Sequence, residues 1–392
     1  MEDFTYHSAT EVIFGHDAHR RLGEVAKRYG ATRVLVMYGS SRIEENGLLD
    51  DVEASLRDAA IDFVPFGGIV PNPRLSHVRR AIEVGREENI DFLLAVGGGS
   101  VIDSAKAAAM GLAEQGDVWD YYVRSRIPAG ALPVGSVLTI AAAGSEASTS
   151  TVITNEEDWL KRSLRSEVVR PKFALMNPEL TASVPWFQTA CGCVDIVMHA
   201  MERFFEPEPN AEVRDLMTEG LIRAVIQNSR VLREDPSNYD ARAEIMWTGS
   251  LAHNDLLGDC NTGDWAVHQM EHELSGMFDI AHGAGLSALW GSWARYVHES
   301  KLARFDALAT NVFDIYTDFS HLNLTALAGI NAMEDWFRSM GLPTRVSDLE
   351  IGLTEDRVRE LADKCTFNGE RTIGKIRELG KDDIETIYRM AR

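Results

Sequence analysis

The sequence predicts an α/β N-terminal domain, a parallel sheet covered by helices, followed by an all-α C-terminal domain. The 392 residues exceed one ordinary core and fit two domains of roughly 150 to 200 residues each. Up to residue 180, short β-branched runs alternate with amphipathic segments, and beyond Pro185 such runs nearly vanish. Pro178 and Pro185 interrupt the periodicity between these halves. We therefore expect one domain over 1–183 and another over 184–392.

The first half alternates between strand and helix signals. Runs rich in β-branched and other apolar residues predict strands over 33–37, 61–64, 92–96 and 136–140. Between them, apolar residues recur at helical spacing over 50–60 and 75–87. A helix that joins two parallel strands is a crossover connection, so these segments predict a parallel sheet.

The second half carries only helical signals. Long amphipathic stretches run over 187–205, 212–233, 239–256 and 286–298. Because no alternating apolar and polar pattern separates them, we expect this half to be entirely helical.

Composition excludes several classes of protein. The hydrophobic fraction of 45% and the charged fraction of 25% are average for globular proteins. A net charge of −21 argues against nucleic acid as a partner, because phosphate binding depends on clustered Lys and Arg. The acidic N-terminus resembles no secretory signal, and no apolar run approaches the ~20 residues that span a bilayer. With four cysteines and no CxxC pair, we expect a reduced, cytoplasmic protein without membrane contact.

A glycine turn follows the third predicted strand. Gly97, Gly98, Gly99 and Ser100 precede a helical segment that contains Asp103. Glycines let the backbone approach a phosphate, and the N–H groups of a starting helix face it. The segment lacks the last glycine of GxGxxG and the GK[ST] of a P-loop, so a different nucleotide fold is indicated. The alternative is a tight turn without a ligand.

A second turn, Gly39-Ser40-Ser41-Arg42, follows the first predicted strand, where an adenosine ribose is usually bound. An acidic residue here would bind the ribose hydroxyls and repel a 2′-phosphate. Ser40, Ser41 and Arg42 instead offer hydroxyls and a guanidinium, which favours NADP(H) over NAD. The alternative is an ordinary solvated turn.

Five potential metal ligands occur in two short windows. Asp195 and His199 are four residues apart on a predicted helix, as are His268 and His272, and His282 follows after a break. One carboxylate with several imidazoles suits Zn²⁺ or Fe²⁺ better than Ca²⁺ or Mg²⁺. Each histidine alone is more often an ordinary core or surface residue, but their clustering favours a divalent metal with an open position.

Several motifs follow one another along nearly the whole chain. They are Pro71-Asn72-Pro73, the GGGS segment with Asp103 and Lys106, Gly144-Ser145-Glu146, Asn177 to Leu180, Asp195 with His199, Glu202, and the window from Trp265 to His282. Taken together, they resemble the iron-containing (group III) alcohol dehydrogenases, in particular the NADPH-dependent butanol dehydrogenase and aldehyde reductase branch. The resemblance implies an α/β nucleotide-binding domain followed by an all-helical metal-binding and catalytic domain, the dehydroquinate synthase-like fold.

Site residues follow from the resemblance. It implies Asp195, His199, His268 and His282 as metal ligands, with His272 as a neighbouring residue that either supports the ligands without touching the metal or relays a proton. Asp195, His268 and His272 would then carry catalysis. The implied cofactor contacts are Gly39, Gly97, Gly98, Gly99, Ser100, Asp103, Thr139 and Lys161. The chain departs from the family at Ala143, where a threonine is usual, and in its first turn, which is often richer in glycine.

The expected activity is a metal-dependent hydride transfer between NADP(H) and a primary alcohol or aldehyde such as butanol or butanal. The metal would polarise the substrate oxygen, and His272 with a water molecule would carry the proton. The resemblance also implies a homodimer. Alternatives are an NAD-dependent glycerol or diol dehydrogenase or a dehydroquinate synthase relative of the same superfamily, a helical phosphohydrolase with a His/Asp metal site, and a silent binding protein.

Overall fold

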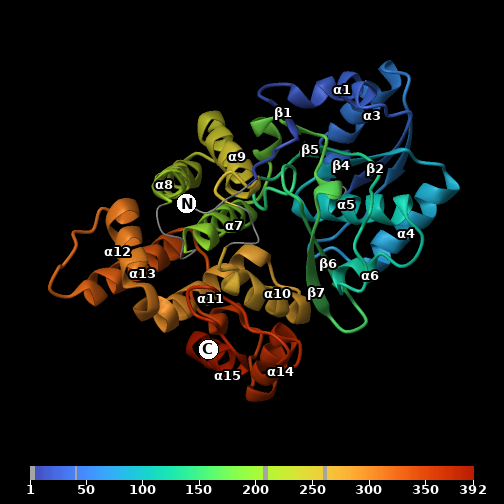
Figure 1. Ribbon diagram of the computed structural model, residues 1–392. Helices are drawn as coiled ribbons and strands as arrows, with labels where there is room; N and C mark the ends of the chain where they lie inside the picture. Colours follow the sequence, from blue (N-terminus) through green and yellow to red (C-terminus); the bar gives the residue numbers. More distant parts are fainter. Residues whose placement is uncertain (1–4, 40–41, 206–210, 259–262) are drawn as a thin grey trace. The chain divides into compact units, whose positions relative to one another are not determined.

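The computed structural model describes residues 5–39, 42–205, 211–258 and 263–392. His7–Val184 form one compact unit, and Pro185–Arg392 make up most of a second. Figure 1 traces the α/β unit from blue to green and the helical unit from green to red. Each unit has its own core.

A six-stranded, fully parallel sheet forms the centre of the α/β unit, as predicted. Its strands follow the order β1-β8-β5-β4-β2-β3. They are β1 (Glu11–Phe14), β2 (Arg33–Tyr38), β3 (Asp62–Phe66), β4 (Phe92–Gly97), β5 (Val134–Leu138) and β8 (Phe173–Met176). The four predicted strands are present, although β5 begins and ends two residues before its predicted range. The short strands β1 and β8 were not predicted.

Helices cover both faces of this sheet. The main ones are α1 (Leu22–Arg28), α3 (Leu48–Asp58), α4 (Leu75–Glu87) and α5 (Gly99–Ala113), and shorter turns are η1 (Ala18–Arg21), α2 (Arg42–Glu45), α6 (Trp119–Tyr122), η2 (Glu167–Val169) and η3 (Pro178–Thr181). Val34 and Val36 of β2 pack with α1 and α3. Leu35 and Met37 point to the other face because side chains alternate along a strand, and they are equally buried. A strand buried on both faces explains the continuous apolar run.

An antiparallel hairpin outside the main sheet was not predicted. It pairs β6 (Ser150–Asn155) with β7 (Leu160–Arg165). The turn places Trp159 at φ 52°, a conformation usually taken by Gly or Asn, so the chain gives no standard turn signal there. The N–H of Thr154 donates to the carbonyl of Pro73 at 2.8 Å, which attaches β6 to the Pro71-Asn72-Pro73 segment.

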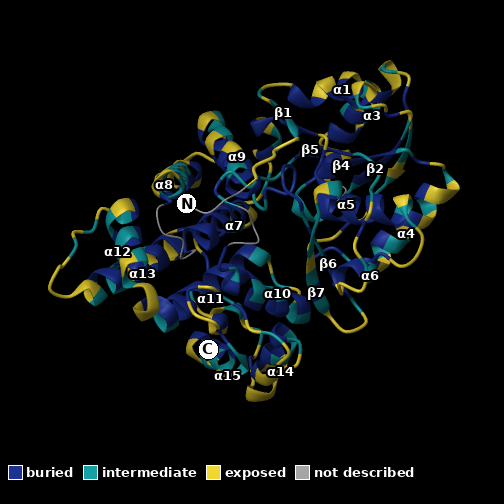
Figure 2. Ribbon diagram, in the orientation of Figure 1, coloured by how far each residue is buried: buried dark blue, intermediate teal, exposed yellow. Residues whose placement is uncertain are grey.

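The described residues of the second unit form helices and no strand, as predicted. They are α7 (Trp186–Phe204), α8 (Glu212–Glu234), α9 (Tyr239–His253), α10 (Ala266–Phe278), α11 (His282–Val297), η4 (His298–Lys301), α12 (Leu302–Ala307), the π-helical η5 (Leu308–Val312), α13 (Leu322–Ser339), η6 (Val346–Leu349), α14 (Glu355–Thr366) and α15 (Lys381–Ala391). Figure 2 shows α7 and α11 as almost entirely buried. Every residue of 192–204 and of 283–294 is buried, as expected for helices surrounded by others.

Two further observations concern membrane-spanning helices and the cysteines. Among the described residues, no helix combines the length and the apolar character that crossing a bilayer requires. The described cysteines are all free thiols, and Cys193 and Cys365 are buried.

Candidate functional site

The sheet topology brings the two glycine turns together. From β2 the chain moves outward to β3, returns to β4 beside β2, and then continues in the opposite direction to β5 and β8. The carboxyl ends of β2 and β4 therefore flank the point where strand order reverses, which is where open α/β sheets bind ligands. A Cβ added to Gly39, after β2, would lie 3.6 Å from the side chain of Val101, after β4. The two predicted cofactor turns are neighbours.

The turn after β4 has room for backbone only. Gly98 precedes α5, and a Cβ added there would lie 2.1 Å from the Ile140 side chain. A Cβ on Gly99 would approach Ala143 to 3.1 Å. The N–H groups of Gly99 and Ser100 belong to the first turn of α5, where the helix supplies no acceptor. The turn therefore combines close backbone approach with the positive end of a helix dipole, which suits a phosphate.

Asp103 and Lys106 contact the protein rather than an open face of the turn. Ser145 donates to one oxygen of Asp103 at 2.6 Å, and the N–H of Val152 donates to the other at 3.0 Å. Burial raises the pKa of Asp103, while nearby Lys106 opposes that shift. The buried Lys106 ammonium donates to the carbonyls of Ser145, Ser148 and Ser150 at 2.6, 3.0 and 2.7 Å. Both side chains hold the segment that links β5 to β6.

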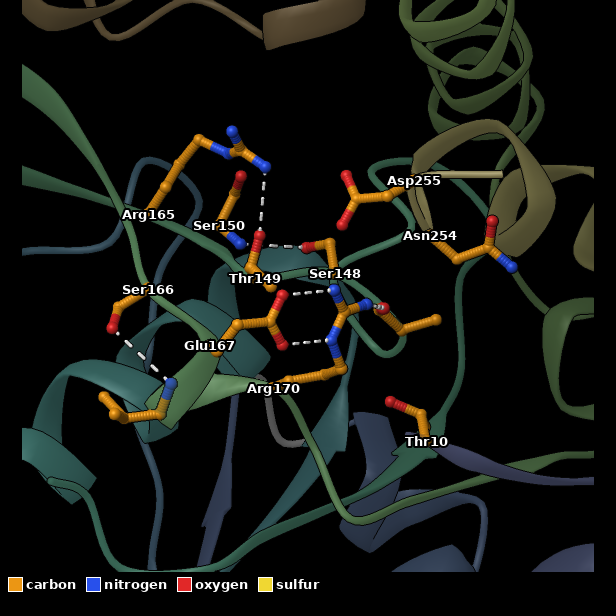
Figure 3. Close-up of polar contacts among 12 residues, drawn as sticks. Thr10, Ser148, Thr149, Ser150, Arg165, Ser166, Glu167, Arg170, Asn254 and Asp255 are labelled. Atoms are coloured by element: carbon orange, nitrogen blue, oxygen red, sulfur yellow. Dashed lines mark hydrogen bonds and ion pairs between the residues drawn. The ribbon is translucent and has the colours of Figure 1, made fainter. Parts of the chain in front are cut away.

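Figure 3 shows how the far end of that segment is fixed. The Arg170 guanidinium makes two hydrogen bonds to the Glu167 carboxylate and donates to the carbonyl of Ala147 at 2.7 Å. Arg165 of β7 donates to the Thr149 hydroxyl at 3.2 Å. Residues 145–150 are thus held at several points by buried or partly buried cations.

The remaining predicted cofactor residues lie in different settings. Thr139 follows β5, and its N–H donates to the carbonyl of Gly97, so it adjoins the glycine turn. Lys161 is buried on β7 and donates to the Asn72 side chain at 3.0 Å. Arg42 is exposed at the start of α2, and burial together with nearby Glu44 of the same helix raises the pKa of Tyr38. Ser40 and Ser41 lie outside the described residues.

Three predicted metal ligands, Asp195, His268 and His282, converge in the helical unit, and the fourth, His199, lies beside Asp195. Asp195 and His199 lie on α7, His268 on α10, and His282 at the first position of α11. The Oδ1 atom of Asp195 lies 3.6 Å from His199 Nδ1, 3.7 Å from His268 Nε2 and 3.6 Å from His282 Nε2. Those distances exceed a hydrogen bond. Donor atoms of Asp195, His268 and His282 lie within 4.8 Å of one another, as expected around a shared ion, whereas His199 approaches Asp195 but is not part of that group.

Gly283 permits the close approach of α11 to α7. A Cβ added to Gly283 would lie 2.2 Å from the carbonyl oxygen of Cys191 on α7. Only a residue without a side chain allows the start of α11 to lie this close to α7. The same contact brings His282, the preceding residue, towards Asp195.

Two carboxylates behind the imidazoles were given no role by sequence reasoning. Glu202 of α7 accepts from His268 Nδ1 at 2.8 Å, and Glu271 of α10 accepts from His282 Nδ1. The sequence does contain a signal for both glutamates. Each one follows a predicted histidine ligand by three residues on the same helix face, Glu202 after His199 and Glu271 after His268. Hydrogen bonds of this kind orient metal-binding histidines in many proteins.

His272 and His253 complete the surroundings. His272 lies one helical turn after His268, is partly buried, and its ring centroid is 5.6 Å from that of His282. His253, at the end of α9, was overlooked because it lies outside the two windows considered. Its ring centroid is 4.1 Å from that of His199, and Trp265 covers both rings from 6.0 and 6.1 Å.

Electrostatics indicate a site that is incomplete without a cation. Burial lowers the pKa of His199 well below its usual value, and neighbouring His253 and His268 add to the shift, so this imidazole is neutral. Burial alone would also lower the pKa of His268, but Asp195 and Glu202 raise it to about 9. Asp195 Oδ1, His199 Nδ1 and His268 Nε2 are buried without a hydrogen-bond partner. A divalent metal between Asp195, His268 and His282 would give Asp195 Oδ1 and His268 Nε2 a partner, and this donor set fits Fe²⁺ or Zn²⁺.

Comparison with protein families identifies the class. Residues 9–178 match the model of iron-containing alcohol dehydrogenases, and residues 189–392 match the C-terminal model of the Fe-containing alcohol dehydrogenase family. The chain belongs to the iron-containing alcohol dehydrogenase family and is an oxidoreductase. Membership implies a nicotinamide cofactor and a divalent metal. Because both halves match, the helical phosphohydrolase considered from the sequence is excluded.

Individual members of this family are similar to the chain over nearly its whole length. Over 389 residues and 99% of both chains, the sequence is 40% identical to a probable NADH-dependent butanol dehydrogenase 1 of Bacillus subtilis. It is 32% identical over 395 residues, all of both chains, to the NADPH-dependent aldehyde reductase YqhD of Escherichia coli. The crystal structure of an NADH-dependent butanol dehydrogenase A from Thermotoga maritima superposes with a TM-score of 0.95 at 35% identity, covering 100% of this chain and 99% of that one.

Proposed function

We propose that this chain transfers a hydride between NADP(H) and a primary alcohol or aldehyde, such as butanol and butanal, at a divalent metal. The observation that carries the proposal is the convergence of Asp195, His268 and His282, whose donor atoms lie within 4.8 Å of one another, with His199 Nδ1 3.6 Å from Asp195 Oδ1. The names of the relatives, butanol dehydrogenases and an aldehyde reductase, support a short, uncharged substrate.

In this proposal Asp195, His199, His268 and His282 hold one Fe²⁺ or Zn²⁺. When bound, the metal polarises the substrate oxygen and the nicotinamide accepts or donates the hydride. His272 moves the proton between the substrate oxygen and solvent, since it adjoins the ligand set and is only partly buried. Asp195 supplies the negative charge that partly neutralises the cation and orders the three imidazoles.

The α/β unit binds the dinucleotide. Gly97, Gly98, Gly99 and Ser100 receive the pyrophosphate, and Gly39 and Thr139 border the same turn. Asp103 and Lys161 act on the cofactor indirectly, because their side chains bind Ser145 and Asn72. This arrangement binds and orients the cofactor through backbone groups.

For cofactor choice we propose NADP(H), on the strength of the turn after β2. Arg42 is exposed and provides a cation for a 2′-phosphate, while Glu44 lies near the Tyr38 side chain. Losing a charged hydrogen bond costs about 1.5–3 kcal/mol. Arg42→Ala should therefore lower kcat/KM for NADPH by roughly tenfold or more and leave that for NADH nearly unchanged. A wild-type preference for NADH would overturn this choice.

The reaction is tested on protein stripped of metal with a chelator and reconstituted separately with Fe²⁺, without oxygen, and with Zn²⁺. Butanal-dependent oxidation of NADPH and NADH is then measured. We expect turnover only after reconstitution, and we expect His268→Ala to abolish both metal retention and turnover while its fold is kept. Turnover by the metal-free protein, or unchanged metal content in His268→Ala, would contradict the proposal.

A further inference from the structure

Two buried glutamates stand directly behind two of the imidazoles around Asp195. Glu202 is 3% exposed, and its Oε1 accepts from both the ring Nδ1 and the backbone N–H of His268, at 2.8 and 3.2 Å. Glu271 is fully buried, and its Oε2 accepts from His282 Nδ1. Burying two carboxylates is costly unless strong hydrogen bonds satisfy them, so these contacts fix the glutamates firmly.

The two glutamates determine which nitrogen of each imidazole carries the hydrogen. A neutral imidazole carries one hydrogen, on either Nδ1 or Nε2. A carboxylate can only accept, so a glutamate facing Nδ1 keeps the hydrogen there and leaves the lone pair on Nε2. The Nε2 atoms of His268 and His282 lie 3.7 and 3.6 Å from the same oxygen of Asp195. When both rings are neutral, as binding of a cation through Nε2 requires, both lone pairs face a common point.

We infer that Glu202 and Glu271 are positioning residues that hold His268 and His282 in the tautomer and orientation required to bind a divalent cation through Nε2. This inference rests on the proposed metal site. Glu202 comes from α7 and orients a histidine of α10, whereas Glu271 comes from α10 and orients the histidine of α11. The two pairs therefore connect the three helices that carry the proposed ligands.

Paired substitutions separate this role from simple packing. Glu202→Leu and Glu271→Leu remove the acceptor. Glu202→Gln and Glu271→Gln keep the shape, but their amides can donate to Nδ1 and so permit the wrong tautomer, with the hydrogen on Nε2. The matched control is Glu219→Gln, because Glu219 is a buried carboxylate of the same unit that accepts from Asn311 rather than from an imidazole.

The main measurement is the dissociation constant for Zn²⁺, obtained by competition with a chromophoric chelator on the metal-free protein. Loss of such an outer carboxylate typically weakens metal binding 10–100-fold. We expect a loss in that range for both leucine variants, roughly tenfold for both glutamine variants, and no change for Glu219→Gln. Turnover should return towards the wild-type kcat at saturating Zn²⁺, because the property lost is affinity.

The outcomes separate the inference from the proposed function. If wild-type protein neither binds Zn²⁺ nor turns over with any metal, the proposed metal site fails. If wild-type protein binds and turns over, but the glutamate variants bind Zn²⁺ with wild-type affinity, the site stands and the inference is overturned. Circular dichroism and melting of the metal-free variants identify any that misfold, and the isosteric glutamine variants decide where leucine is not tolerated.

Discussion

At the scale of single residues, the helical unit concentrates buried charge near the start of α10. Asp264 is an example outside the proposed ligand set. Its carboxylate accepts from the N–H groups of Ala266, Lys375 and Ile376 at 3.2, 2.7 and 2.8 Å. It therefore ties the turn before α10 to a distant segment of the chain. Burial, with nearby Glu202, raises its pKa to about 6 despite these donors.

That raised pKa gives stability a defined dependence on pH. The folded state keeps the Asp264 proton up to about pH 6, whereas the unfolded chain releases it near pH 4. Between those values the folded state binds more protons, so the free energy of unfolding falls as pH rises. Relative to Asp264→Asn, which cannot titrate, metal-free wild-type protein should lose on the order of 2–3 kcal/mol between pH 4 and pH 7.

Urea unfolding followed by tryptophan fluorescence measures this difference at several pH values. Only the difference between the two proteins is interpreted, because titrating groups that do not interact with Asp264 contribute equally to both. A difference that stays constant with pH would mean that Asp264 has an ordinary pKa. A difference that grows in the opposite direction would mean that the three N–H donors outweigh burial.

At the scale of elements, strong local patterns were predictable and contacts between distant segments were not. β4 and the glycine turn after it followed from an apolar run and three glycines. β1 and β8 are only four residues long, and they pair with each other although most of the α/β unit lies between them in the sequence. The hairpin of β6 and β7 turns at Trp159, which has no preference for the positive φ that it adopts.

In the candidate site, too, contacts within one helix were predictable and contacts between helices were not. Helical spacing placed Asp195 beside His199 and His268 beside His272. The spacing could not establish that Glu271 reaches His282 across the break between α10 and α11, because that contact depends on how closely the two helices pack. His253 was missed for the same reason, since it meets His199 only through the packing of α9 against α7.

The packing of α11 against α7 gives a prediction at this scale. In Gly283→Ala the new Cβ would lie 2.2 Å from the Cys191 carbonyl oxygen, so the start of α11 must move away from α7. We expect destabilisation of about 1–3 kcal/mol from overpacking, together with weaker Zn²⁺ binding because His282 moves too. Urea unfolding and chelator competition measure the two effects.

A glycine in the same unit supplies the control. Gly220 lies inside α8 with nothing within 4 Å of an added Cβ. Gly220→Ala should leave metal affinity unchanged and stabilise the protein by up to about 1 kcal/mol, since alanine favours the helix. Equal behaviour of the two variants would show that the contact between Gly283 and Cys191 imposes no constraint.

At the scale of the whole molecule, the chain divides its chemistry between two units with separate cores. The turns proposed to bind phosphate lie entirely within His7–Val184, and the four proposed metal ligands lie entirely within Pro185–Arg392. A ligand that binds only the folded state stabilises the segments that its binding orders. Each unit should therefore respond most strongly to its own ligand.

Hydrogen exchange read by mass spectrometry tests this division. Removing the metal should raise amide exchange in α7, α10 and the start of α11, because buried polar atoms lose their partner. Adding NADPH to metal-free protein should lower exchange at 97–102 and around Gly39, and leave the middle of α7 largely unchanged. If NADPH instead protected the metal-free α7 and α10 as strongly as Zn²⁺ does, the units would not respond separately, and the proposed metal site would have to be organised mainly by the cofactor.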